Sequence, residues 1–355
     1  MVPGTSRAAE RLEGMTLVDG WKVVSRINKP LDATGGFFSV GYIVERTDGQ
    51  RGFLKALDYS QAFQPSSGIP VSVALQQLTE ALNFEKYVLA RCRDRGLDKV
   101  VISISDGTVT VGQLGVDTVE YLIFELADGD VRKEMLLINR LDVLWRFKSL
   151  HDIAIGLEQL HWNDIVHQDL KPSNVLVFNK VSFKLADFGR SACDGQKPPH
   201  DSCLFAGDQT YAPPDVLFKF SLSDEKLRRL SFDAYLLGSM VVFFFTGQGV
   251  TPLILKEMPP LYVDWANYKG GAEDAKLHLR DAFSKFLLNF KNDLPPSFDA
   301  AIVRIVQELC EPDPTRRGHP KERRGTPAQF SLKRYVTQFD LLLKRAELGR
   351  GQGLI

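Results

Sequence analysis

Four side chains that could act on a phosphate group lie in two short stretches. Residues 167–174 read His-Gln-Asp-Leu-Lys-Pro-Ser-Asn and hold Asp169, Lys171 and Asn174; Asp187 opens Asp-Phe-Gly 13 residues after Asn174. Phosphoryl transfer depends on a carboxylate that orients the attacking hydroxyl, a cation near the moving group and oxygen ligands for Mg²⁺. The stretches therefore predict phosphoryl transfer; the alternative is that these are polar loop residues capping adjacent strands.

In this order, with a predicted strand pair between them, the two stretches closely resemble the catalytic loop and metal-binding triplet of eukaryotic-type (Hanks-type) protein kinases. The resemblance implies that Asp169 is the catalytic base and that Lys171 contacts the γ-phosphate. It implies that Asn174 and Asp187 hold the metal ions, with ATP and Mg²⁺ as cofactors.

Three residues outside these stretches fit the same resemblance, which covers roughly residues 21–318. Asp233 lies on an apolar helical stripe, where a carboxylate must be satisfied by hydrogen bonds; in the family the matching Asp braces the catalytic loop. Arg317 ends Asp-Pro-Thr-Arg-Arg, and the resemblance pairs it with Asp215 at the end of Tyr-Ala-Pro-Pro-Asp.

The first half of the chain carries the expected ion pair of a phosphate-binding lysine. Lys55, within Phe-Leu-Lys-Ala, lies where the family has that lysine. Its partner should be a Glu on the following helix, for which Glu85 and Glu80 are candidates. Glu85 projects within the arc of leucines at helical spacing, whereas Glu80 lies on the opposite side, so we choose Glu85. The leucines are Leu75, Leu78, Leu82 and Leu89.

The nucleotide-covering loop departs from the family pattern. Residues 33–40 align with Gly-x-Gly-x-x-Gly-x-Val, and only Gly35 matches one of the three glycines that let a backbone approach phosphates. Phe53 replaces the small residue that usually roofs the adenine. Val40 and Leu176 remain as apolar walls of the expected pocket.

The resemblance also implies the segment that meets the adenine. Glu125, Leu126 and Ala127 should form the hinge whose backbone hydrogen-bonds the base, behind Phe124 as a bulky gatekeeper. Asp130 is expected to contact the ribose.

Two substitutions bear on control of the activity. Gln168 stands where many regulated kinases have an Arg beside the catalytic Asp, so a phosphorylated activation loop would lack its usual charge partner. We therefore predict activity without phosphorylation at Ser191, Ser202 or Thr210. Asp208 occupies the place of a Thr that bridges the catalytic Asp and Lys in the serine/threonine branch; Thr210 is a possible substitute.

The order of elements predicts an α+β, two-lobed fold with a small β-rich lobe and a larger, mainly helical one. We place a loosely attached N-terminal arm at 1–20, the first lobe at 21–126, the second at 127–345 and a tail at 346–355. A helix is expected over Phe330 to Leu343. Strands are expected within Trp21–Leu57, at Val100–Ile104 and Val119–Phe124, and at Val175–Phe178 and Phe183–Ala186.

Charge and hydropathy limit the partners and the cellular location that we expect. The chain has 355 residues, and its 44 Lys and Arg balance 44 Asp and Glu, which gives no reason to expect nucleic acid or a membrane as a partner. Met240–Phe245 is the most apolar stretch and is far shorter than the about 20 residues that span a bilayer. We expect a cytoplasmic protein with four free cysteines, although Cys193 and Cys203 are a possible redox pair.

The predicted function is ATP- and Mg²⁺-dependent phosphorylation of serine and threonine hydroxyls of protein substrates, including possible autophosphorylation. One alternative is a pseudokinase, a nucleotide-binding or scaffolding module, which the irregular loop and Phe53 favour. Another is transfer of a nucleotidyl group from an inverted ATP pose. The basic residues from Arg316 to Arg324 are either a solvated face or an anionic docking site.

Overall fold

The computed structural model describes residues 7–28, 39–63, 70–112, 117–137 and 142–351. Two compact units make up the chain: one comprises residues 1–96 and 101–127, and the other comprises 97–100 and 128–355. The first is β-rich and the second mainly helical, so the prediction of an α+β fold with a small β-rich part and a larger, mainly helical part is confirmed.

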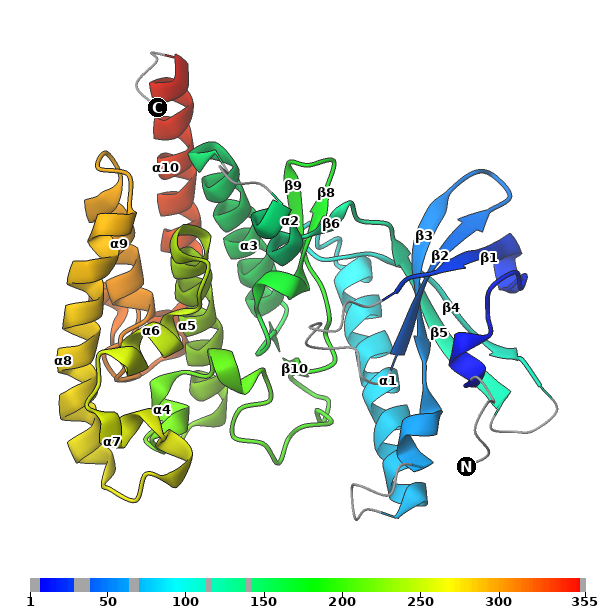
Figure 1. The fold of residues 1–355 in the computed structure, drawn as a ribbon, viewed down its shortest axis with the longest axis horizontal. Helices are drawn as coiled ribbons and strands as arrows, with labels where there is room; N and C mark the ends of the chain where they lie inside the picture. Colours follow the sequence, from blue (N-terminus) through cyan, green and yellow to red (C-terminus); the bar gives the residue numbers. More distant parts are fainter. Residues whose placement is uncertain (1–6, 29–38, 64–69, 113–116, 138–141, 352–355) are drawn as a thin grey trace. The chain divides into compact units, whose positions relative to one another are not determined.

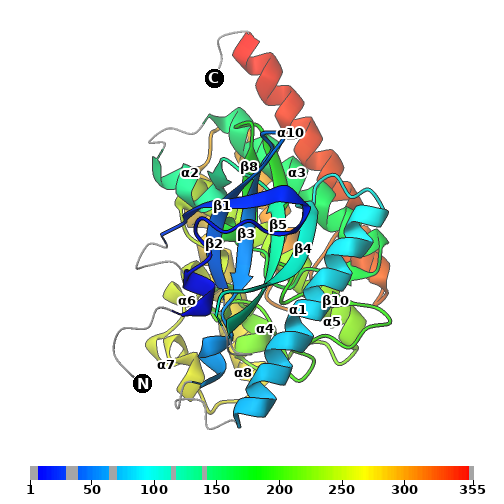
Figure 2. The ribbon, with the colours of Figure 1, turned by 90° about the vertical axis from the view of Figure 1, so that its right-hand side faces the viewer.

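The first unit is built on a five-stranded antiparallel sheet in the order β1-β2-β3-β5-β4 (Figure 1). The Gly49 N–H donates to the Arg46 carbonyl and so closes the predicted hairpin between β2 and β3. Gly49 has φ of 84°. Figure 2 shows the five strands side by side with the long helix α1 beside β4. The bounds are β1 Trp21–Arg26, β2 Ser39–Arg46, β3 Arg51–Leu57, β4 Ser103–Thr110, β5 Thr118–Glu125 and α1 Val71–Asp94.

The strand predicted at Val100–Ile104 is misplaced, because β4 begins only at Ser103 and continues to Thr110. Val100 instead forms an isolated bridge with Leu185 in the second unit, to which it belongs. β4 is an edge strand with half-buried and exposed side chains along its length, and such a strand tolerates polar residues. Because of these polar residues, the sequence pattern did not indicate a strand beyond Ile104.

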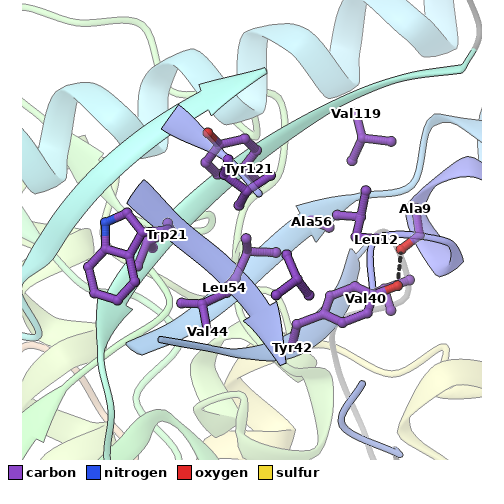
Figure 3. Packing of buried hydrophobic residues seen from close by; sticks show 13 residues of the cluster. Ala9, Leu12, Trp21, Val40, Tyr42, Val44, Leu54, Ala56, Val119 and Tyr121 are labelled. Atoms are coloured by element: carbon purple, nitrogen blue, oxygen red, sulfur yellow. Dashed lines mark hydrogen bonds between the residues drawn. The ribbon is translucent and has the colours of Figure 1, made fainter. Parts of the chain in front are cut away.

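The N-terminal residues from 7 onward are part of the sheet's core, so the expectation of a loose arm is wrong for residues 7–20. Leu12 is fully buried, and Ala9 packs in the same apolar cluster (Figure 3). The Tyr42 hydroxyl donates a 2.7 Å hydrogen bond to the Ala9 carbonyl. Arg7 pairs with Asp58 at 2.9 Å, and two short 3₁₀ helices, η1 Ala8–Glu10 and η2 Val18–Gly20, shape the segment.

The second unit is built around α5, Glu225–Thr246, whose residues from Leu230 to Phe244 are all buried. By length and composition α5 could cross a membrane, but 83% of its most apolar window is buried inside the protein, as in a core helix. The other helices are α2 Val131–Leu137, α3 Val143–Trp162, α4 Pro214–Leu217, α6 Val250–Lys256, α7 Pro260–Val263, α8 Ala272–Phe290, α9 Asp299–Leu309 and α10 Lys333–Gly351.

Short strands and 3₁₀ turns complete this unit. One small sheet has the order β6-β8-β9 and the other pairs β10 with β7. Their bounds are β6 Gly129–Asp130, β7 Ile165–Val166, β8 Val175–Phe178, β9 Ser182–Leu185 and β10 Ala192–Cys193. The 3₁₀ turns used below are η6 Pro172–Asn174 and η7 Gln209–Tyr211; η3 Tyr59–Phe63 lies in the first unit.

The terminal helix is longer than predicted. It begins at Lys333, three residues after the predicted start, packs along α3 and continues to Gly351. Ala346 is fully buried, so a tail from residue 346 is wrong over 346–351; residues 352–355 lie outside the described part of the chain. The four cysteines, all of which lie in the described part of the chain, form no disulfide, and the alternative pairing of Cys193 with Cys203 is not formed.

Candidate active site

The lysine and glutamate predicted to pair in the first unit are in contact. Lys55 lies on β3, and its Nζ is 2.8 Å from Glu85 Oε1 and 2.9 Å from Oε2 on α1. Glu85 is buried, whereas Glu80 is exposed and accepts a hydrogen bond from Gln76. The prediction that the glutamate on the apolar side of the helix pairs with Lys55 is therefore confirmed.

Phe53 is accommodated by a glycine on the neighbouring strand. A Cβ at Gly41 would lie 2.9 Å from Phe53 Cε2, so the ring occupies the space that a side chain at position 41 would need. The Phe53 ring also lies 6.4 Å from the ring of Phe124. Val40 is buried nearby in the sheet's core, whereas Gly35 lies outside the described residues.

The segment predicted as the hinge begins with an internally anchored residue. The Glu125 N–H donates to the Ile102 carbonyl at 3.2 Å, and the Glu125 carboxylate accepts from the Ile102 N–H at 2.8 Å. Ala127 is half-buried at the end of the first unit, and Leu176 is half-buried on β8 of the second. Contacts of these residues with adenine remain predictions.

Asp233 on α5 fixes the backbone of the predicted catalytic loop, as the family resemblance implies. This fully buried carboxylate accepts the N–H groups of His167 and Gln168 at 2.8 and 2.7 Å. His161 Nε2 lies 2.9 Å from the same carboxylate, a contact that the sequence analysis missed. Gln168 has φ of 61°, a left-handed conformation that such a brace must stabilise.

Asp169 is the residue on which the loop's contacts converge. Asn174 Nδ2 donates to the Asp169 carbonyl at 2.8 Å and to its Oδ2 at 3.1 Å. Lys171 Nζ lies 3.1 Å from Oδ2, and the N–H of Asp208 donates to Oδ1 at 2.8 Å. The side-chain oxygens thus have donors that fix their orientation, as a base that must meet a hydroxyl requires.

A main-chain hydrogen bond links Asn174 to the residue that precedes Asp187. The Ala186 N–H donates to the Asn174 carbonyl at 2.9 Å, immediately before Asp187. Asp187 itself is exposed and has φ of 65°. Because the Asn174 NH₂ group donates to Asp169, its Oδ1, which accepts a long 3.4 Å bond from the Ser173 hydroxyl, is turned away from that carboxylate.

A carboxylate and an amide oxygen fit Mg²⁺, which takes one or two protein carboxylates and completes its shell with water and phosphate oxygens. Within the described ranges, no group of three or more His, Cys, Asp or Glu side chains is placed to hold a metal ion.

The predicted pair at the end of the activation segment is formed and fully buried. Arg317 Nη2 lies 2.6 Å from Asp215 Oδ1, with the two side chains 0% and 1% exposed. Arg317 also donates to the Ser231 hydroxyl at 2.7 Å, and its guanidinium lies 4.9 Å from the ring centre of Tyr235. In contrast, Arg316, Lys321 and Arg324 are exposed, which both a solvated face and an anionic docking site require.

Thr210 does not take the bridging position that we considered for it. Its hydroxyl and its N–H both donate to Asp208 Oδ1, at 2.7 and 3.0 Å. Asp208 Oδ2 instead lies 3.5 Å from Lys171 Nζ. The missed signal was the residue type at position 208, since an aspartate carries the charge opposite to that of a lysine.

Carboxylates also anchor the segment between Asp187 and Asp215 to the first turns of α5, which the sequence analysis did not foresee. Asp201 Oδ1 lies 3.0 Å from Arg229 Nη2, and Asp194 Oδ2 lies 2.8 Å from Lys226 Nζ. The sequence offered a signal in these two cations at the start of the helix, but their partners lie 28 and 32 residues away.

Comparison with known proteins gives matches of one kind. A family described as "Protein kinase domain" matches residues 85–326. "Calmodulin-binding receptor-like cytoplasmic kinase 1" of Arabidopsis thaliana is 31% identical over 243 residues, which cover 66% of this chain and 47% of the relative. "Hormonally up-regulated neu tumor-associated kinase homolog A" of Xenopus laevis is 24% identical over 281 residues, covering 78% and 36%. The chain thus spans half or less of the length of these relatives.

Proposed function

Because the chain belongs to the protein kinase family, in its eukaryotic-type (Hanks-type) serine/threonine branch, we propose that it phosphorylates proteins. The proposed reaction transfers the γ-phosphate of ATP, with Mg²⁺, to serine or threonine hydroxyls. The observation that carries the proposal is the set of donors that fixes Asp169: Asn174, Lys171 and the N–H of Asp208. A carboxylate oriented in this way is suited to accept the proton of an attacking hydroxyl.

The other predicted residues supply binding and charge neutralisation. Lys171 would meet the γ-phosphate, while Lys55, oriented by Glu85, would bind the phosphates nearer the nucleoside. Asn174 and Asp187 would hold Mg²⁺, which neutralises phosphate charge when bound. Gly35, Val40, Glu125, Ala127 and Leu176 would surround the nucleotide.

A pseudokinase is the second candidate, and Phe53 is the observation that favours it. Its ring takes the place of the small residue that roofs the adenine in the family. The packing of Phe53 over Gly41 supports the kinase proposal, because the ring has a defined place within the sheet. The complete set of Lys55, Glu85, Asp169, Asn174 and Asp187 supports it further.

The test is transfer of label from γ-³²P-ATP with Mg²⁺ to the protein itself and to a generic serine/threonine substrate. We expect alkali-labile label that maps to serine or threonine. α-³²P-ATP run in parallel should leave the protein unlabelled, because a kinase transfers only the γ-phosphate. A nucleotidyl transferase would instead attach the labelled α-phosphate to the acceptor. A thermal shift with ATP and no label on the protein or the generic substrate would favour the pseudokinase.

The balanced charge remains our reason to propose that the protein partners neither nucleic acid nor a membrane. The scattered cysteines, which fit a reducing compartment, remain our reason to propose a cytoplasmic protein. ATP and a protein with an acceptor hydroxyl are the proposed partners.

We predict that activity does not require phosphorylation of the activation segment. Gln168 donates to the Arg190 carbonyl at 3.1 Å and offers no charge to a phosphate. Asp201 and Asp194 already make the ionic contacts to α5 that a phosphate would otherwise supply. After phosphatase treatment, verified by mass spectrometry, the initial rate should stay within about twofold of the untreated rate.

An Arg229→Ala variant serves as the contrast, because it removes the partner of Asp201 without touching any phosphorylation site. It should lower the rate more than phosphatase does. The prediction is wrong if phosphatase silences the protein and rephosphorylation at Ser191, Ser202 or Thr210 restores activity.

A further inference from the structure

A groove of about 780 Å³ on the second unit contains none of the residues assigned to the proposed reaction. It lies between the C-terminal end of α3, the N-terminal end of α5 and the 3₁₀ turn η11, Pro327–Phe330. The buried side chains of Ile165, Leu230 and Phe330 form part of its lining and make that part apolar. Its volume falls within the range of about 300–1,000 Å³ of cavities that enclose drug-sized ligands.

The groove is also lined by Trp162, the last residue of α3, which is 75% exposed. Its indole Nε1 donates a 3.0 Å hydrogen bond to Glu158 Oε1, one helical turn earlier. The N–H of Leu332 donates to the other oxygen of Glu158 at 3.1 Å. These contacts hold a carboxylate at the edge of an indole ring whose faces are open to solvent.

The carboxylate of Glu158 has no positively charged partner. Its two contacts are with neutral N–H groups, and no lysine or arginine in the described part of the chain pairs with it. A carboxylate has about four acceptor positions, so Glu158 can accept further hydrogen bonds from a cation that approaches the ring.

The rest of the groove also has more negative than positive side chains. Five of the lining side chains are carboxylates, whereas the lysines and arginines among them are Lys226, Arg229 and Lys333. His161 also lines the groove, but the balance stays negative even if this side chain is protonated. Lys226 is itself shared by two carboxylates, those of Asp164 at 3.0 Å and Asp194 at 2.8 Å. The groove therefore attracts cations and repels phosphate groups.

A second hollow, of about 430 Å³, shares Trp162 and Glu158 with this groove. The apolar side chains of Leu97, Ile155 and Val336 contribute to its lining. Because both hollows meet at the Trp162 ring, an extended peptide that crosses the ring can place side chains in each, whereas a small molecule would fill only one.

We propose that these two hollows bind a segment of a partner protein through an arginine that stacks on Trp162 and pairs with Glu158. Tryptophan is the aromatic side chain that attracts a cation most strongly. A planar guanidinium can stack on a ring and donate to a carboxylate, which the compact ammonium of a lysine does less well. Apolar side chains beside the arginine would cover the apolar lining, and the excess of carboxylates opposes a nucleic acid in the same place.

The test measures binding by the full chain without turnover, so a protein that binds but transfers no phosphate would refute only the proposed function. The probes are pools of short fluorescent peptides with random flanking residues and a central arginine, lysine, citrulline or glutamate. Fluorescence anisotropy should show binding of the arginine pool about tenfold tighter than that of the citrulline pool, which keeps the shape of arginine without its charge. Added salt should weaken binding of the arginine pool and leave the citrulline pool unchanged.

Two variants test the proposed contacts. Trp162→Leu keeps an apolar side chain but removes the aromatic face, and it should weaken binding of the arginine pool about tenfold with an unchanged melting temperature, because the ring is exposed. Glu158→Gln should weaken the arginine pool and not the citrulline pool. Leu288→Ala and Glu273→Gln, which alter an exposed apolar side chain and an exposed carboxylate on α8, are the matched controls and should bind as the wild type does.

Equal affinities for the arginine and citrulline pools, or an unchanged affinity in Trp162→Leu, would overturn the proposal. N-acetylarginine methylamide that binds as tightly as the arginine pool would also overturn it, because the occupant would then be a small guanidinium compound. A concentration-dependent dimer in sedimentation that Trp162→Leu abolishes would assign the ring to a second copy of this chain instead of to a partner.

Discussion

Replacing Asp169 with asparagine is expected to lower phosphate transfer by about 10²- to 10⁴-fold, the range for loss of a general base. The amide keeps the size of the side chain but does not take up the hydroxyl proton. Since Asn174 still donates to the main-chain carbonyl of residue 169 and the N–H of Asp208 can donate to the one remaining side-chain oxygen, the loop should keep its conformation. The measurement is the initial rate of transfer from γ-³²P-ATP, together with nucleotide affinity, which should be unchanged.

Two further variants serve as comparisons for Asp169→Asn. Asp187→Asn should remove Mg²⁺-dependent nucleotide binding as well as transfer, because Asp187 is a proposed metal ligand rather than the base. Asp281→Asn, on the exposed face of α8, controls for the general effect of losing one carboxylate. Equal transfer by Asp169→Asn and the wild type would refute the role of Asp169.

Removing Arg317 is expected to destabilise the protein by about 3–5 kcal/mol, because it leaves the buried Asp215 without its charge partner. The Ser221 hydroxyl, which donates to Asp215 Oδ2 at 2.8 Å, neutralises no charge. Urea unfolding of Arg317→Ala would show the loss as a lower free energy of unfolding of the second unit.

The neighbouring Arg316→Ala provides the control, since an exposed side chain should contribute within about 0.5 kcal/mol. The double variant Asp215→Leu/Arg317→Met should recover much of the lost stability, because an apolar pair leaves no unpaired charge. If Arg317→Ala unfolds at the same urea concentration as Arg316→Ala, the pair contributes no stability.

Contacts that follow from local periodicity were predictable from the sequence. The helical arc distinguished Glu85 from Glu80, and the apolar stripe around Asp233 required hydrogen bonds that the catalytic loop provides. Such inferences succeed because the spacing of side chains on a helix is fixed by its geometry. The pairing of Asp215 with Arg317 came from the family resemblance instead, and no periodicity links residues 102 positions apart.

Contacts that depend on the path of an irregular segment were not predictable. The pairing of Asp208 with Lys171 depends on a turn that returns the chain after 37 residues. The N-terminal segment was misjudged because Leu12 and Leu17 lie in a polar, Gly-containing stretch and show no helix or strand period. Their burial arises from the sheet they cover, not from their own sequence.

That covering has a consequence for how the chain can change. The family match runs from residue 85 to residue 326. Leu12 and Phe339, which lie outside the match, are nevertheless fully buried. Linkers accept most substitutions, whereas interior positions accept few. The buried positions within 7–20 and 333–351 therefore face the selective constraint of a core, and the boundary of the family match is not the boundary of mutational tolerance.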